Sequence, residues 1–184
     1  LGAEVVAGHR IVANLAALAY MLPLSLAIAT LSLLGQAVGA RDWLRAHAVV
    51  KAGMLLAGMS SSLLGLLLWW LASPIVAAYT DDPAVRAVAL SLVGYVAAYQ
   101  FFDALQTVAG HALRAYRVTF VPMLIQVFCF WGIGLLGGWW LCWRGGFTLG
   151  VQGFWLASVL SLVAAAGLLG PLLRKTMQAT ESTL

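Results

Sequence analysis

The sequence has 184 residues, of which 63% are hydrophobic and only 9% are charged. Ordinary soluble domains are about 45–50% apolar and about 25% charged, so a soluble fold of this composition would expose apolar surface and aggregate. The net charge of +4 comes from Lys and Arg residues that form no run and no patch interleaved with aromatic residues, which excludes a nucleic-acid-binding protein.

Five apolar stretches follow one another along the chain, each long enough to cross about 30 Å of hydrocarbon as a helix of roughly 20 residues. They cover residues 11–34, 49–71, 85–110, 120–142 and 151–173, and Asp82-Pro83 begins the third. Lipid admits only helices or closed barrels, and these stretches lack the alternation of barrel strands. The sequence therefore predicts an all-α, polytopic five-helix membrane bundle over residues 1–173. Residues 174–184 are expected to form a polar, frayed cytoplasmic tail.

The Lys and Arg residues between these stretches are unevenly distributed. One side holds seven of them: Arg41, Arg45, Lys51, Arg114, Arg117, Arg174 and Lys175. The other side holds three: Arg10, Arg86 and Arg144. The positive-inside rule therefore predicts that the N-terminus lies outside and the C-terminus lies in the cytoplasm. Because the first residue is not Met and the number of spans is odd, we expect at least one further helix upstream.

Asp103 is the only acidic residue well inside a predicted span. Placing an Asp at the centre of a membrane helix costs about 2.5–3.5 kcal/mol, so such residues are candidates for a functional site. Helical spacing places four polar side chains on the same face: Tyr99, Gln100, Gln106 and Thr107. A carboxylate among oxygen-bearing groups can hold Na⁺ or a proton, with more ligands from another helix. The alternative is a structural hydrogen bond to a neighbouring helix.

Other polar groups inside the spans are weaker signals. Asn14 is a candidate for an interhelical hydrogen bond or a place in a pore, and Pro23 predicts a kink. Gln126, residues 60–62 and the glycines of the fourth stretch are typical of helix packing. The histidines form no metal-ligand spacing: His9, His47 and His111. Without a nucleophile motif or a nucleotide-binding loop, the sequence predicts a protein that is not an enzyme and that has no cofactor.

Several segments, in this order and spacing, resemble the multidrug and toxic compound extrusion (MATE) family: "HRIVANLAALAYMLPLSLAIAT", "GQAVGA", "YTDDPAV", "YQFFDALQTVAGHALRAYRVTFVP" and "GVQGFWLASVLSL". The resemblance covers nearly the whole chain and matches helices eight to twelve of that family's twelve. It implies a multi-pass protein of the bacterial inner membrane that exports small organic cations by antiport with Na⁺ or H⁺. Asp103 falls on the acid of the family's coupling-ion site, and Tyr99 on the tyrosine one turn earlier.

The resemblance also implies what the chain lacks, namely an N-terminal lobe and a seventh helix that usually carries a partner glutamate. Many relatives have a glutamine where this chain has Arg10, and a cation there would compete with Na⁺ for Asp103. Gln106, Asn14 and Thr107 are further candidates for modulating the cavity. Two alternatives remain: a lipid-linked oligosaccharide flippase, which would need several cavity-facing Arg residues for pyrophosphate, and a non-transporting membrane subunit.

Overall fold

The computed structural model describes residues 2–143 and 149–183, so Arg144 of the charge count lies outside the described residues. The described part is helical throughout its length apart from short turns, with no strand among these residues. In chain order the elements are α1 (Ala3–Gly39), α2 (Trp43–Trp70), α3 (Ala72–Tyr79), α4 (Pro83–Ala115), α5 (Phe120–Val127), the π-helix η1 (Phe128–Leu136), α6 (Gly137–Trp143) and α7 (Val151–Thr183).

Five helical rods are long and apolar enough to cross a membrane: α1, α2, α4, the continuous rod α5–η1–α6, and α7. Their most apolar windows have mean hydropathies between 1.4 and 2.1. The predicted all-α bundle with five spans is therefore confirmed. Most of the rods extend beyond the predicted stretches, because hydropathy marks the hydrocarbon core whereas a helix continues through the interface.

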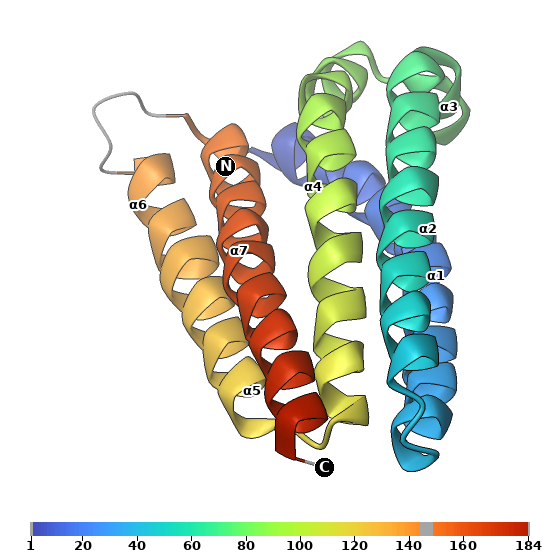
Figure 1. Cartoon of the computed structure of the whole chain (residues 1–184). Helices are drawn as coiled ribbons and strands as arrows, with labels where there is room; N and C mark the ends of the chain where they lie inside the picture. Colours follow the sequence, from blue (N-terminus) through green and yellow to red (C-terminus); the bar gives the residue numbers. More distant parts are fainter. Residues whose placement is uncertain (1, 144–148, 184) are drawn as a thin grey trace.

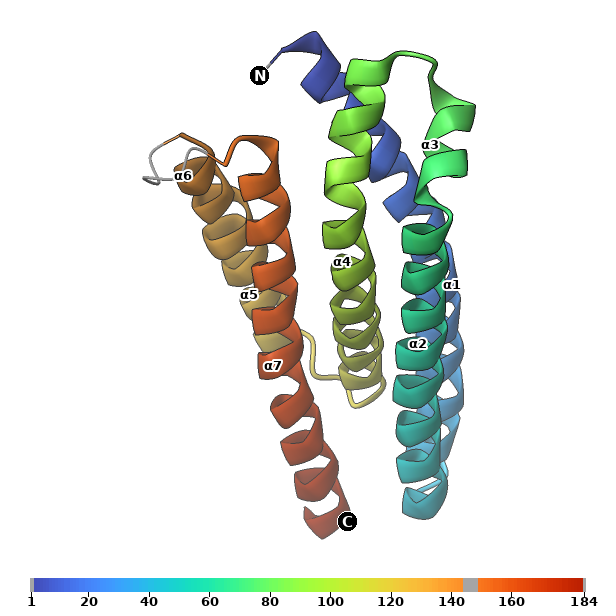
Figure 2. The same ribbon diagram turned by 90° about the horizontal axis from the view of Figure 1, so that it is seen from above.

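Helix α4 occupies the middle of the bundle. It lies between α7 on one side and the α1–α2 pair on the other in both views (Figure 1, Figure 2). Small residues let the neighbours approach closely, since a Cβ on Gly8 of α1 would lie 2.8 Å from Val88 Cβ. A Cβ on Gly65 of α2 would lie 3.1 Å from the carbonyl oxygen of Ala97. Such close contacts are typical of membrane helices, which lipid does not drive together.

The connections alternate between the two ends of the bundle. The α1–α2 and α4–α5 connections lie at the same end as the C-terminus, and α3 lies at the opposite end (Figure 1). Asp82 caps α4 by accepting hydrogen bonds from the amides of Ala84 and Val85, which confirms the predicted start of that helix. The assignment of the C-terminal end to the cytoplasm stays a prediction.

The polar C-terminal segment is helical, and the prediction that it is frayed was wrong. Helix α7 continues to Thr183, and its apolar stripe continues with it. Leu169, Leu173 and Met177, four residues apart, are all buried in one hydrophobic cluster. The Thr180 hydroxyl donates to the carbonyl oxygen of Thr176 at 2.8 Å. Packing of this stripe therefore orders a segment whose composition alone is typical of a disordered end.

Pro23 lies inside α1 and is buried. The part of α1 nearest the N-terminus slants away from the rest of the helix in Figure 2. Proline removes one backbone donor and its ring crowds the preceding turn, so a bend in this helix is expected.

Two glycines of the fourth span, Gly134 and Gly138, pack against α7. A Cβ on Gly134 would lie 3.3 Å from Ser161 Oγ, and a Cβ on Gly138 only 2.6 Å from Cδ1 of Phe154. The close packing predicted from these glycines is therefore present, and α7 is the neighbour that the sequence could not name. The π-helix η1 lies in the same rod, and such helices are rare and often found at functional sites.

We expect Gly138→Ala to be less stable than Gly137→Ala by about 1–3 kcal/mol, because only the first methyl group enters occupied space. A Cβ on Gly137 would come no closer than 3.8 Å to the Gly132 carbonyl oxygen. Both changes raise helix propensity equally, so the difference in stability between the two variants measures the steric clash alone. The thermal unfolding midpoint of the full-length protein in detergent measures it, and equal midpoints would contradict the α6–α7 packing described above.

Candidate functional site

A cavity of about 750 Å³ separates α1 and α4 from η1 and α7. Most of its lining is aliphatic or aromatic, and a few polar side chains point into it: His9, Tyr20, Tyr99, Asp103, Gln106 and Ser158. Small-molecule sites typically have this size, an apolar lining and a few polar groups. We call it the acidic cavity, because Asp103 is the only acidic side chain among the described residues that line it.

Asp103 begins a chain of buried hydrogen bonds that links two spans. Its side chain is only 5% exposed, and its Oδ1 accepts a hydrogen bond of 2.9 Å from Nε2 of Gln106. The Oε1 of Gln106 in turn accepts a hydrogen bond of 3.0 Å from Nε2 of Gln126 on α5. Gln106 Nε2 also lies 3.0 Å from Thr107 Oγ1. Gln126, interpreted from the sequence as a packing contact, is thus part of the support for the carboxylate.

The polar stripe predicted on this helix divides into two groups. Tyr99, Asp103 and Gln106 line the acidic cavity, whereas Gln100 and Thr107 do not. Gln100 instead points at α1, where its Nε2 donates to the carbonyl oxygen of Ala16 at 3.2 Å. The same helix face therefore serves both the cavity and the contact between α1 and α4.

Trp155, Tyr99 and His9 line one side of the acidic cavity, which we call the aromatic wall. Trp155 of α7 is 7% exposed, and its Nε1 donates a hydrogen bond of 3.2 Å to Nδ1 of His9 on α1. The His9 and Trp155 ring centroids are 5.8 Å apart. Tyr99 meets Trp155 edge to face, with centroids 5.9 Å apart and an interplanar angle of 75°. Trp155 thus connects α7 with α1 and α4 across the cavity.

Sequence reasoning missed His9 as a residue of the site. It considered His9 only as a metal ligand and found no partner at the right spacing. Ala13, Ala16 and Tyr20 lie four, seven and eleven residues after His9, on the same helix face, and all of them line the cavity. That periodicity was readable, but the contact with Trp155 was not, since 146 residues separate the two positions.

The structure does not bring two of the predicted modulators to Asp103. Arg10 is exposed, and its neighbour His9 takes the position in the cavity lining. Asn14 is also exposed, and its Oδ1 accepts a hydrogen bond of 3.1 Å from the Tyr79 hydroxyl of α3. Asn14 therefore makes the predicted hydrogen bond between helices, outside the acidic cavity.

Asp103 is the candidate ligand that the acidic cavity offers to a cation. Among the described residues no three His, Cys, Asp or Glu side chains come together as a metal site. Asp103 and the Tyr99 hydroxyl supply oxygen atoms to the same cavity. One carboxylate is not a complete set of ligands for a hard cation, so water or another segment has to supply the others.

Comparison with known proteins identifies the family. Residues 1–140 match the MatE family model. The chain belongs to this family. It is the MATE family that the sequence motifs resemble, and its members are membrane transporters rather than enzymes. With its five apolar helices, the chain is a multi-pass protein of the bacterial inner membrane.

The curated relatives are longer than this chain. The probable multidrug resistance protein NorM of Aromatoleum aromaticum is 55% identical over 185 residues, which cover 99% of this chain and 40% of that protein. The multidrug resistance protein PmpM of Pseudomonas aeruginosa is 42% identical over 172 residues, which cover 90% of this chain and 35% of that protein. The chain thus spans about 40% or less of the length of these relatives.

A solved structure shares the fold. The eukaryotic MATE transporter AtDTX14 superposes with a TM-score of 0.86 over 98% of this chain and 41% of that chain. The sequence identity is 17%, so this likeness concerns the arrangement of the helices alone.

We expect Gln106→Leu to reduce the free energy of unfolding by about 1–3 kcal/mol for each polar group left unpaired, here Asp103 and Gln126. The control is Gln36→Leu, the same change at an exposed position near the end of α1. Thermal unfolding midpoints of the two variants of the full-length protein, measured in the same detergent, compare them. Gln106→Leu as stable as the control would mean that the buried chain of hydrogen bonds is not formed.

Proposed function

We propose that this bundle is the ion-coupling part of a MATE multidrug efflux transporter that exports small organic cations in antiport with Na⁺ or H⁺. The observation that carries the proposal is the buried carboxylate of Asp103 in the wall of a ligand-sized cavity. No Lys or Arg side chain lines the described part of that cavity, so no built-in cation neutralises Asp103 there.

A single carboxylate in such a cavity favours the exchange of one cation for another over the simple binding of one ligand. An ionised carboxylate away from water is costly unless a cation, a proton or hydrogen-bond donors compensate it. Gln106 supplies one donor, and the remaining compensation comes from whatever cation enters the cavity. A coupling ion and an organic cation then compete for the same charge, so that arrival of one favours departure of the other. Each also biases the bundle towards the conformation that binds it better.

The aromatic wall suits an organic cation as the exported substrate. Rings of Trp and Tyr attract cations at their faces, worth about 0.5–2 kcal/mol each depending on desolvation. Trp155 and Tyr99 offer such rings in the cavity that contains Asp103. Flat, positively charged aromatic compounds fit both the charge and the shape of this site.

The transporter that we propose includes more than the residues of this chain. The MATE resemblance implies an N-terminal lobe and a seventh helix with a glutamate, and the relatives exceed this chain in length. We propose that these parts complete the cavity and supply a second carboxylate near Asp103. The membrane lipid surrounds the remaining faces of the bundle.

The described residues favour transport over the two alternative functions. A flippase for pyrophosphate-linked oligosaccharides needs cavity-facing Arg, which the described lining does not provide. A non-transporting subunit needs Asp103 to pair structurally. Gln106 and Gln126 do pair with one side of the carboxylate, but the residue also lines the acidic cavity, which a purely structural role does not require. The carboxylate facing a cavity supports transport instead.

We expect Asp103→Asn to reduce cation-driven efflux by about tenfold or more, because the amide keeps the shape but cannot hold a compensating charge. The assay follows export of an organic cation from vesicles containing the full-length protein, under an imposed Na⁺ gradient or an imposed proton gradient. The gradient that drives the unmodified protein identifies the coupling ion. Asp81→Asn, the same change at an exposed position, should transport normally. Unchanged efflux by Asp103→Asn under both gradients would refute the proposal.

We expect Trp155→Ala to raise the KM for a cationic aromatic dye by about 3- to 30-fold, the equivalent of one cation–π contact. Trp155→Phe keeps a ring in the cavity and should raise it less, which separates a lost ring from a disturbed fold. Trp70→Ala removes a tryptophan that is 77% exposed and does not line the cavity, so its KM should stay unchanged. An equal KM for Trp155→Ala and Trp70→Ala would remove the aromatic wall from the substrate site.

A further inference from the structure

A second cavity, of about 740 Å³, lies between α2 and α7 towards the end of the bundle that holds the C-terminus. It shares no lining residue with the acidic cavity. Its basic side chains are His47 and Lys51 on α2 and Arg174 on α7. We call it the basic groove.

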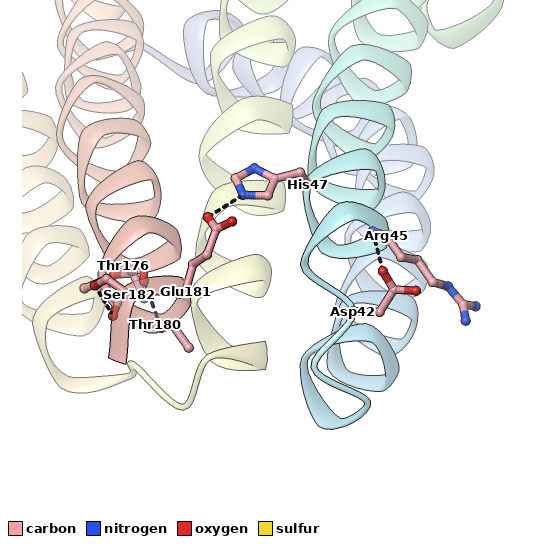
Figure 3. A network of polar contacts seen from close by, with 8 residues as sticks. Asp42, Arg45, His47, Thr176, Thr180, Glu181 and Ser182 are labelled. Atoms are coloured by element: carbon pink, nitrogen blue, oxygen red, sulfur yellow. Dashed lines mark hydrogen bonds and ion pairs between the residues drawn. The ribbon is translucent and has the colours of Figure 1, made fainter. Parts of the chain in front are cut away.

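The two strong cations of the basic groove have no ionic partner among the described residues. Lys51 and Arg174 are both exposed, and the ion pairs of the described chain do not include them. The nearby acid Glu181 pairs with His47 instead, with 3.3 Å between His47 Nε2 and Glu181 Oε2 (Figure 3). This pair joins the ends of α2 and α7, and Lys51 and Arg174 follow about one and two turns farther from the end of the bundle.

The part of the groove farther from the end is apolar and open. Leu55 of α2 lies one turn beyond Lys51 and is 53% exposed. On α7, Gly170 and Gly167 lie one and two turns beyond Arg174, and a Cβ on either glycine would meet nothing within 4 Å. No side chain of the described bundle therefore fills this part of the groove, which continues from the cations towards the middle of the span.

We propose that the basic groove binds an anionic phospholipid, with its phosphate at Lys51 and Arg174 and an acyl chain along Leu55, Gly170 and Gly167. Basic residues at a membrane surface attract anionic lipid by about 1 kcal/mol each, and basic pockets between spans bind lipid headgroups. Arg also forms paired hydrogen bonds to phosphate oxygens. The apolar continuation distinguishes a phospholipid from free phosphate, and the uncompensated positive charge distinguishes it from a neutral or zwitterionic lipid.

Such a lipid would join two helices that have little direct contact. Helices α2 and α7 each pack extensively on α4, and the His47–Glu181 pair is a hydrogen bond between their side chains. A phosphate between Lys51 and Arg174 adds a second link one to two turns away from that pair. The bound lipid therefore completes the contact between α2 and α7.

The test measures which lipid stays bound to the full-length protein. Native mass spectrometry of protein purified in mild detergent compares phosphatidylglycerol with phosphatidylethanolamine of the same acyl chains. We expect the protein to retain phosphatidylglycerol preferentially, and the double variant Lys51→Gln/Arg174→Gln to bind it roughly 30-fold more weakly. The matched control Arg45→Gln/Lys175→Gln removes the same charge from the same two helix segments outside the groove and should keep the preference.

A second variant tests the acyl chain separately from the charge. Gly167→Leu fills the apolar part of the groove without changing its charge, and we expect it also to reduce phosphatidylglycerol retention. Inorganic phosphate should not displace the bound lipid. Equal retention of both lipids, equal loss in the matched control, or displacement by inorganic phosphate would overturn the proposal. A photoactivated crosslinker attached to the thiol of Leu55→Cys that labels another protein segment would overturn it too, because a protein would then occupy the groove.

Discussion

The buried carboxylate of Asp103 needs hydrogen-bond donors or a cation to compensate its charge. The helices around it are placed so that their side chains can supply part of that compensation. Its helix, α4, lies in the middle, where two neighbouring spans can reach it. Gln106 turns its amide onto Asp103 and is itself held by Gln126 of α5. One side of the carboxylate is thereby fixed by protein, and the other side faces the acidic cavity. A fully satisfied acid would be a structural element, whereas the cavity side of this one is where the proposed cation would bind.

The acidic cavity lies where close packing within two groups of helices gives way to contacts through aromatic rings. Farther along the bundle the two groups pack directly on each other, in the cluster that contains Leu113 and Leu169. Gly8 and Gly65 bring α1 and α2 against α4, and Gly138 brings the fourth span against α7. Between these groups the contacts near the cavity are made by large aromatic rings, above all Trp155, which touches His9 and Tyr99. Rings at such a boundary can change neighbours without breaking backbone hydrogen bonds. Small residues thus bring the helices together within each group, and aromatic residues stand between the groups at the cavity.

The fold and the central residue of the site could be predicted from the sequence, because each follows from local properties. Segment length and hydropathy determine five spans, and the cost of a buried carboxylate singles out Asp103. Contacts between distant segments could not be predicted, since periodicity gives the faces of one helix but not which faces meet. His9 and Arg10 are adjacent, and only the packing of α1 shows that His9 faces the cavity. The helical end of α7 was readable, because Leu169, Leu173 and Met177 continue its apolar stripe.

Helix α7 forms a wall of both the acidic cavity and the basic groove, and Pro171 lies inside this helix. Trp155 lies in the first half of the helix and Arg174 in the second, with Pro171 between the acidic cavity and the cations of the groove. Proline removes the hydrogen bond to the Gly167 carbonyl, and the open space around Gly167 and Gly170 leaves the groove side of that region unpacked, whereas Leu169 on the other side is buried. On the two proposals made above, a cation and a phospholipid act on different halves of one helix. Those halves are joined at Pro171, and a proline is a typical point of bending in a helix. On these proposals, a lipid that holds the second half against α2 would leave the first half able to move with the walls of the acidic cavity.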